Sequence, residues 1–122
     1  MICFKVDDVN EMNAQLNNFL HFLKVNGADD DAVFDSRLVC CELITNVLRH
    51  CGCGAIFKGE LNGGVIKITV RAEEPVGEIR VPDLPSVLAE GGRGLYIVNA
   101  VSKGNVFISN GTVTVKLSVK QR

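Results

Sequence analysis

Polar residues interrupt the largely apolar stretch "CCELITNVLRHCGCG" at residues 40–54, and three of them are regularly spaced. Glu42, Asn46 and His50 follow one another at intervals of four residues, a drift of only about 40° per step on an α-helix. A carboxylate, an amide and an imidazole therefore share one side of this predicted helix. Because buried polar groups without a partner are costly, the row predicts a partner: another part of the protein, a metal or a ligand.

A second candidate binding element is "GGRGL", residues 91–95, where a glycine-rich turn runs into a predicted helix. Exposed backbone N–H groups in such a turn, together with the positive end of the helix dipole, favour a phosphate. Taken alone, the motif is more often an ordinary turn before a helix.

Cysteines near the polar row offer a different chemistry. His50, Cys51 and Cys53 are of the residue types that bind zinc, but the sequence has no fourth ligand at suitable spacing. A redox pair of Cys51 and Cys53 would form a strained disulfide at this short spacing. Cys40 and Cys41 are expected to act as small hydrophobic residues inside the helix. A metal or redox protein is the remote alternative.

Composition sets the context for these motifs. The 122 residues are expected to form a single domain, residues 1–122, with 47% hydrophobic residues and a net charge of −1. Without a basic stripe, direct binding to nucleic acid or to an anionic membrane is not expected. No apolar run approaches the length of a membrane span, and no secretory signal is visible. We therefore expect a cytoplasmic protein with reduced thiols.

The elements that position the motifs follow from periodicity. The sequence predicts a strand at 2–6, a helix from the capping box at Asp8 and Glu11 to Gly27, and a central helix from Asp29 to about His50. Hairpins are predicted at 55–72 and 106–119, and a third helix at about 94–102. The strands alternate apolar and polar residues, which indicates a sheet covered on one side only. The expected fold is of the α+β class: a two-layer α/β sandwich with a mostly antiparallel sheet and helices on one face.

The segment 73–94 between the hairpins holds all three prolines and lacks periodicity. Such a long irregular segment is typical of a functional loop or lid.

Together, these motifs resemble the GHKL ATPase superfamily. Glu42-x-x-x-Asn46-x-x-x-His50 on a central helix is similar to its N-box, and "GGRGLYIV" is similar to its second glycine box. The spacing of "LAEGGRGLYIV" and the small size most resemble bacterial anti-sigma-factor serine/threonine kinases. The order of elements matches over nearly the whole chain, which implies the Bergerat, or histidine-kinase ATPase-like, fold.

The resemblance also implies roles for single residues. Asn46 would bind Mg²⁺ through its amide oxygen, and Glu42 would act as general base on a serine hydroxyl. His50 would support the nucleotide edge. The phosphates of ATP would be held by the second glycine box, that is by Gly91, Gly92, Arg93, Gly94 and Leu95. The implied partners are a sigma factor and an antagonist protein that is phosphorylated, and the family is commonly dimeric.

The first glycine box of the family departs from its usual pattern. Ala72 stands where the family has the aspartate that binds the adenine amino group, and Glu74 stands where it has a glycine. Glu73 is expected to point to the wet face of the sheet. A nucleotide-independent protein-binding regulator of the same fold is therefore the alternative function.

Overall fold

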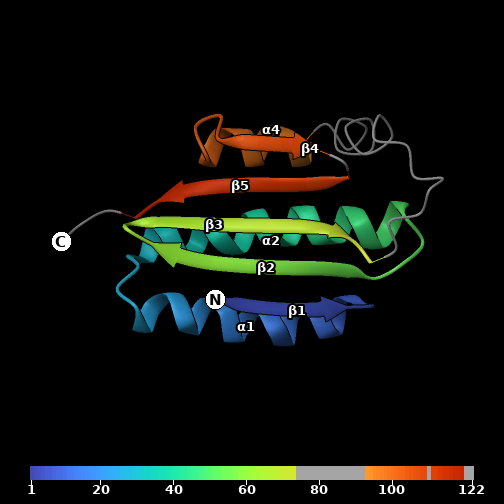
Figure 1. Ribbon diagram of the computed structural model, residues 1–122, viewed down its shortest axis with the longest axis horizontal. Helices are drawn as coiled ribbons and strands as arrows, with labels where there is room; N and C mark the ends of the chain where they lie inside the picture. Colours follow the sequence, from blue (N-terminus) through green and yellow to red (C-terminus); the bar gives the residue numbers. More distant parts are fainter. Residues whose placement is uncertain (74–92, 110, 120–122) are drawn as a thin grey trace.

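A five-stranded antiparallel sheet forms one layer of the protein in the computed structural model, which describes residues 1–73, 93–109 and 111–119. The strands lie in the order β1-β2-β3-β5-β4, and each neighbouring pair is antiparallel (Figure 1). Their bounds are β1 Ile2–Val6, β2 Ala55–Asn62, β3 Val65–Ala72, β4 Val106–Ser109 and β5 Thr112–Ser118. The two predicted hairpins are confirmed.

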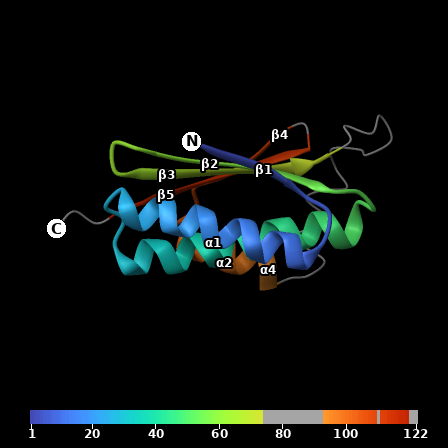
Figure 2. The ribbon, with the colours of Figure 1, turned by 90° about the horizontal axis from the view of Figure 1, so that it is seen from below.

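Helices α1 (Val9–Val25), α2 (Asp30–His50) and α4 (Arg93–Val101) cover one face of this sheet (Figure 2). Helix α2 packs against α1, against α4 and against three strands, so it is the central helix. The arrangement is an α+β sandwich of two layers, as the sequence predicts. None of the helices among the described residues is long and apolar enough to cross a membrane.

Local sequence explains where the two long helices begin and end. The Asp8 carboxylate caps α1 by accepting a hydrogen bond of 2.8 Å from the Glu11 backbone N–H. The Asp29 carboxylate caps α2 in the same way through the Ala32 N–H, at 3.3 Å. After α1, Gly27 adopts a φ of 95°, which glycine tolerates without a steric penalty.

The interior lies between the sheet and the helices. Alternate residues of the strands point into it, and the inward-facing group of β3 and β5 is fully buried: Ile66, Ile68, Val70, Val113, Val115 and Leu117. Phe19 of α1 meets Phe57 of β2 edge to face, with ring centroids 4.9 Å apart. The same Phe19 ring lies directly over Gly59, where a side chain would collide with it.

One large apolar residue of the central helix lies outside the interior. Phe34 of α2 is 65% exposed. It lines a groove between α1 and α2 on the side away from the sheet. Counting apolar residues along a helix does not show that the neighbouring helices leave part of its circumference uncovered.

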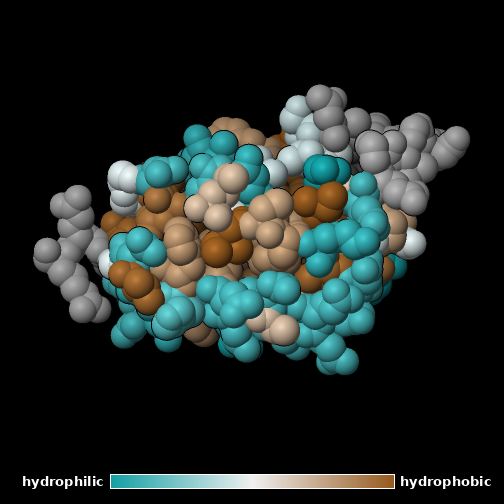
Figure 3. Space-filling model, turned by 60° about the horizontal axis from the view of Figure 1, so that its bottom comes forward, coloured by the Kyte–Doolittle hydropathy of each residue, from teal (hydrophilic) through white to brown (hydrophobic). Residues whose placement is uncertain are grey.

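The β1 edge of the sheet carries apolar surface. In the oblique view of Figure 3, apolar residues gather in the middle of the face and hydrophilic residues cover its lower rim. Ile2 and Phe4 of β1 are half-buried, and Phe4 stacks on Phe57 at a centroid distance of 4.4 Å.

Candidate functional site

Two residues of the predicted polar row lie in the second half of α2. Asn46 is 4% exposed, and its Oδ1 accepts a hydrogen bond from Arg49 Nη2 at 3.4 Å. Glu42, one turn earlier, is half-buried and has no hydrogen bond or ion pair with the described residues. His50 is the last residue of α2, and its side chain lies outside the described part of the structure.

The row faces α4 rather than α1. Asp35 lines a cavity of about 350 Å³ together with Val101 and Ser102, at the C-terminal end of α4. Glu42 follows Asp35 by seven residues, which is about two helical turns, so both point in nearly the same direction. The side of α2 that faces α1 is marked by Arg37, which lines a groove with Asn17 and His21 of α1. Arg37 is five residues before Glu42 and therefore about 140° around the helix from it.

The start of α4 lies near the level of Glu42. Helix α4 runs in the opposite direction to α2, with Val101 beside the N-terminal part of α2 (Figure 1). Eight residues at about 1.5 Å per residue place Arg93 about 12 Å further along, which corresponds to the middle of α2. The fold therefore brings the N-terminus of α4, whose first backbone N–H groups have no partner within the helix itself, towards the polar row.

The glycine-rich motif is only partly described. Arg93, Gly94 and Leu95 form the first turn of α4, while their side chains lie outside the described part. Gly91 and Gly92 precede the described segment, as does most of the predicted lid.

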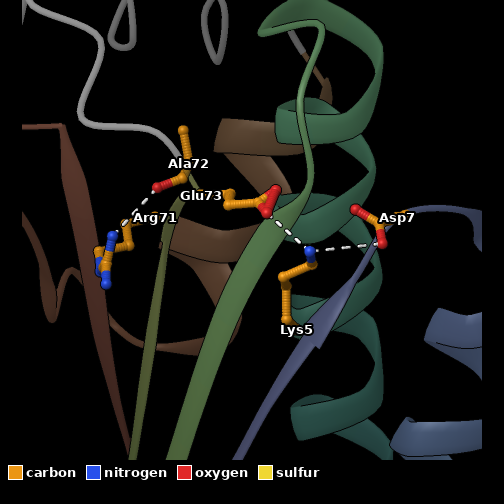
Figure 4. A network of polar contacts seen from close by, with 5 residues as sticks. All are labelled: Lys5, Asp7, Arg71, Ala72 and Glu73. Carbon is orange, nitrogen blue, oxygen red and sulfur yellow. Dashed lines mark hydrogen bonds and ion pairs between the residues drawn. The ribbon is translucent and has the colours of Figure 1, made fainter.

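Ala72 and Glu73 end β3 on opposite faces of the sheet. Ala72 pairs with Ala55 of β2, is half-buried and packs against the core, so its methyl group points inward as expected. The Glu73 carboxylate lies 2.6 Å from the Lys5 ammonium, whose other neighbour is Asp7 at 3.6 Å (Figure 4). Lys5 is on the face of the sheet that the helices leave uncovered. Glu73 is therefore engaged on that face, as the strand parity predicts. Glu74 lies outside the described residues.

The cluster of Lys5, Asp7 and Glu73 depends on Gly54. The Glu73 N–H donates to the Gly54 carbonyl at 2.7 Å. A side chain at Gly54 would collide with Asp7 and would lie 2.9 Å from the Val6 carbonyl oxygen. The hydrogen bond from Lys5 to Glu73 and the charge of Asp7 raise the pKa of Lys5. Sequence reasoning missed the cluster, because Lys5 and Glu73 are 68 residues apart in the chain.

The cysteines are free thiols. Burial raises the pKa of Cys40 well above its usual value, and burial together with Cys53 raises the pKa of Cys51. A raised pKa lowers the thiolate fraction, so Cys40 and Cys51 are weaker nucleophiles than an exposed thiol. In the described part of the chain, no group of three or more His, Cys, Asp or Glu residues could hold a metal ion.

Comparisons of the chain with models of protein families and with curated proteins find no match. Any functional assignment must therefore come from the motifs and their geometry.

Proposed function

We propose that the protein is a GHKL-type regulatory domain that binds Mg-ATP between α2 and α4, phosphorylates an antagonist protein on serine or threonine, and controls a sigma factor. One observation carries the proposal: Glu42 and Asn46 lie on the side of α2 that faces α4, and the N-terminus of α4 lies near the level of Glu42. The likeness of the two motifs to the N-box and the second glycine box supports the same reading.

Asn46 has the chemistry that a magnesium site of this kind requires. An amide oxygen is a hard, neutral ligand with two lone pairs, and the 3.4 Å bond from Arg49 is long for a hydrogen bond. Oδ1 therefore has capacity for another partner. Magnesium bound with a nucleotide takes few protein ligands, because phosphates and waters fill most positions. When bound, Mg²⁺ would neutralise charge on the transferred phosphate.

Glu42 is suited to proton transfer. Its side chain is half-buried and has no hydrogen bond or ion pair with the described residues, so it can accept a proton from a substrate hydroxyl. Arg93 and the backbone of Gly91, Gly92, Gly94 and Leu95 would contact the phosphates, which places positive charge where phosphoryl transfer spreads negative charge. His50 would lie at the nucleotide edge.

A second candidate function is a partner-binding regulator that does not use nucleotide. It is favoured by the methyl group of Ala72 at the inward position of β3 and by the ion pair that holds Glu73 on the open face. Neither residue offers a carboxylate to an adenine amino group from inside the sandwich. In both candidates the protein acts in the cytoplasm through protein partners, and its apolar β1 edge is compatible with a homodimer.

Glu42→Gln tests the catalytic proposal. We expect phosphate transfer to the cognate antagonist to fall by about 10²–10⁴, the usual contribution of a general base, while Mg-ATP affinity stays within about twofold. Transfer is followed with radiolabelled ATP and affinity by calorimetry. Asp35→Asn, on the same side of α2 but nearer its N-terminus, is the matched control and should transfer normally. Unchanged transfer in Glu42→Gln would reject the proposal.

A further inference from the structure

The two layers of the protein carry opposite charge. Helices α1 and α2 with their N-caps hold seven acidic residues, Asp8, Glu11, Asp29, Asp30, Asp31, Asp35 and Glu42, against three basic ones, Lys24, Arg37 and Arg49. The strands hold five basic residues, Lys5, Lys58, Lys67, Arg71 and Lys116, against a single acidic residue, Glu60. The net charge of −1 therefore averages an acidic helical layer and a basic sheet.

All five strand cations lie on the open face of the sheet. Residues paired across neighbouring strands share a face. The registers pair Lys5 with Ile56, which pairs in turn with Arg71. They also place Lys67 between Glu60 and Lys116. The same face carries hydroxyl groups of Thr69, Thr112, Thr114, Ser109 and Ser118. We call this surface the open face. It is rich in hydrogen-bond donors, and among the described residues its five cations outnumber the anions Glu60 and Glu73.

Three of the cations form no ion pair with the described residues. Glu73 pairs with Lys5, and Glu60 lies 3.9 Å from Lys58. Lys67 is paired in the β2–β3 register with Glu60, but no ion pair joins them. Arg71 and Lys116 also make no ion pair with the described residues, and the Arg71 guanidinium donates to the Ala72 carbonyl at 3.2 Å.

Lys67 and Lys116 are also directly opposite one another on β3 and β5. Like charges in this position disfavour a sheet. The carboxylate next to this pair in the register is Glu60, which is opposite Lys67 on β2 and lies 3.9 Å from Lys58. The Cα atoms of Lys67 and Lys116 are about 4.5–5.5 Å apart in such a register, so both ammonium groups can reach one phosphate.

From this we propose that the open face binds single-stranded nucleic acid, mainly through its phosphates. Phosphate contacts in nucleic-acid complexes come from Lys and Arg and from Ser and Thr hydroxyls, which are the residue types of this face. Protein interfaces are instead depleted in Lys and Ser, which disfavours an acidic protein as the occupant.

Two planar groups on the open face can stack on bases. Phe107 of β4 is 53% exposed, with Lys116 Nζ 5.5 Å from its ring centroid. Arg71 offers a guanidinium plane. A flat sheet leaves the bases of a single strand accessible to both, whereas it cannot enter the groove of a duplex. This activity is independent of the nucleotide site proposed between α2 and α4.

The test is fluorescence anisotropy of the full chain with a labelled oligouridine of about 20 nucleotides, titrated over a range of NaCl concentrations. Three phosphate contacts predict a slope of log K against log salt of about −2.

Changing Lys67→Gln together with Lys116→Gln should weaken binding at least about tenfold and reduce the slope to about −0.7. Arg71→Gln alone should remove one contact. The matched control, Lys24→Gln with Arg37→Gln, alters the net charge equally on the helical layer and should bind within about twofold of wild type.

The melting temperature separates a lost contact from a damaged fold. The double variant removes the repulsion between Lys67 and Lys116 together with the attraction between Lys67 and Glu60, so it should melt close to the wild-type temperature. Three results would overturn the proposal: no binding to oligouridine at low salt, an equal loss in the control variant, or tighter binding to a poly-glutamate peptide that the double variant loses. The last result would identify an acidic protein partner instead.

Discussion

The interior of the sandwich consists of packed apolar side chains, whereas the polar row of α2 and the end of the sheet near Ala72 carry the groups proposed for binding. Helix α2 contributes to both the interior and the polar row. On the sheet-facing side of α2, Leu43 and Ile44 are at most 1% exposed and belong to the hydrophobic core. One residue before and two residues after this pair, Glu42 and Asn46 add polar groups that a packed core does not need. The difference suggests that stability and binding can be changed separately on the same helix.

Ile44→Ala should give the largest effect on stability. Its side chain is fully buried, so truncation removes apolar contacts and leaves a cavity. We expect the free energy of unfolding to fall by about 2–5 kcal/mol, measured by urea denaturation. Phe34→Ala removes a larger side chain from the same helix, but one that is 65% exposed, and should change stability by less than about 0.5 kcal/mol. Equal losses in both variants would remove the distinction between the two sides of α2.

Ala72→Asp should strengthen the binding of ATP. A carboxylate at this inward position would restore the acceptor that the resemblance associates with the adenine amino group. A charge-assisted hydrogen bond predicts about ten- to a hundredfold tighter ATP binding, with little gain for GTP. Competitive calorimetry with both nucleotides measures this. Equal gains for ATP and GTP would show that position 72 does not contact the base.

Glu73→Gln should have the smallest effect, confined to the open face. Lys5 has its pKa raised above 10.5 in the folded protein by Glu73 and Asp7, so its contribution to stability is present below pH 10.5 and is lost as the pH rises through the raised value. We expect a slightly lower melting temperature for the variant near neutral pH, converging with wild type at alkaline pH. A difference that stays constant across this range would mean that the charge of Glu73 is not what matters.

The elements were predictable because their signals are local. Strand alternation, the caps at Asp8 and Asp29 and the glycine turns each depend on a few neighbouring residues, and the structure confirms them. The exposure of Phe34 was not predictable, because it depends on where α1 happens to leave α2 uncovered.

The site was predictable to a smaller extent. The spacing of Glu42 and Asn46 placed them on one side of a helix, but only the fold shows that this side faces α4. The cluster of Lys5, Asp7 and Glu73 unites residues that are distant in sequence. The open face was hidden for another reason: a net charge near zero conceals cations and anions that the fold sorts onto opposite layers.

The most direct test of the account is calorimetric titration of the protein with ATP, with and without Mg²⁺, in wild type and in Asn46→Ala. Asp30→Ala, an exposed change at the far end of α2, is the control. The account predicts magnesium-dependent binding at micromolar strength that Asn46→Ala weakens at least about tenfold and the control does not. No heat at millimolar nucleotide, or binding that is indifferent to magnesium and to Asn46, would contradict it and would favour the nucleotide-independent regulator.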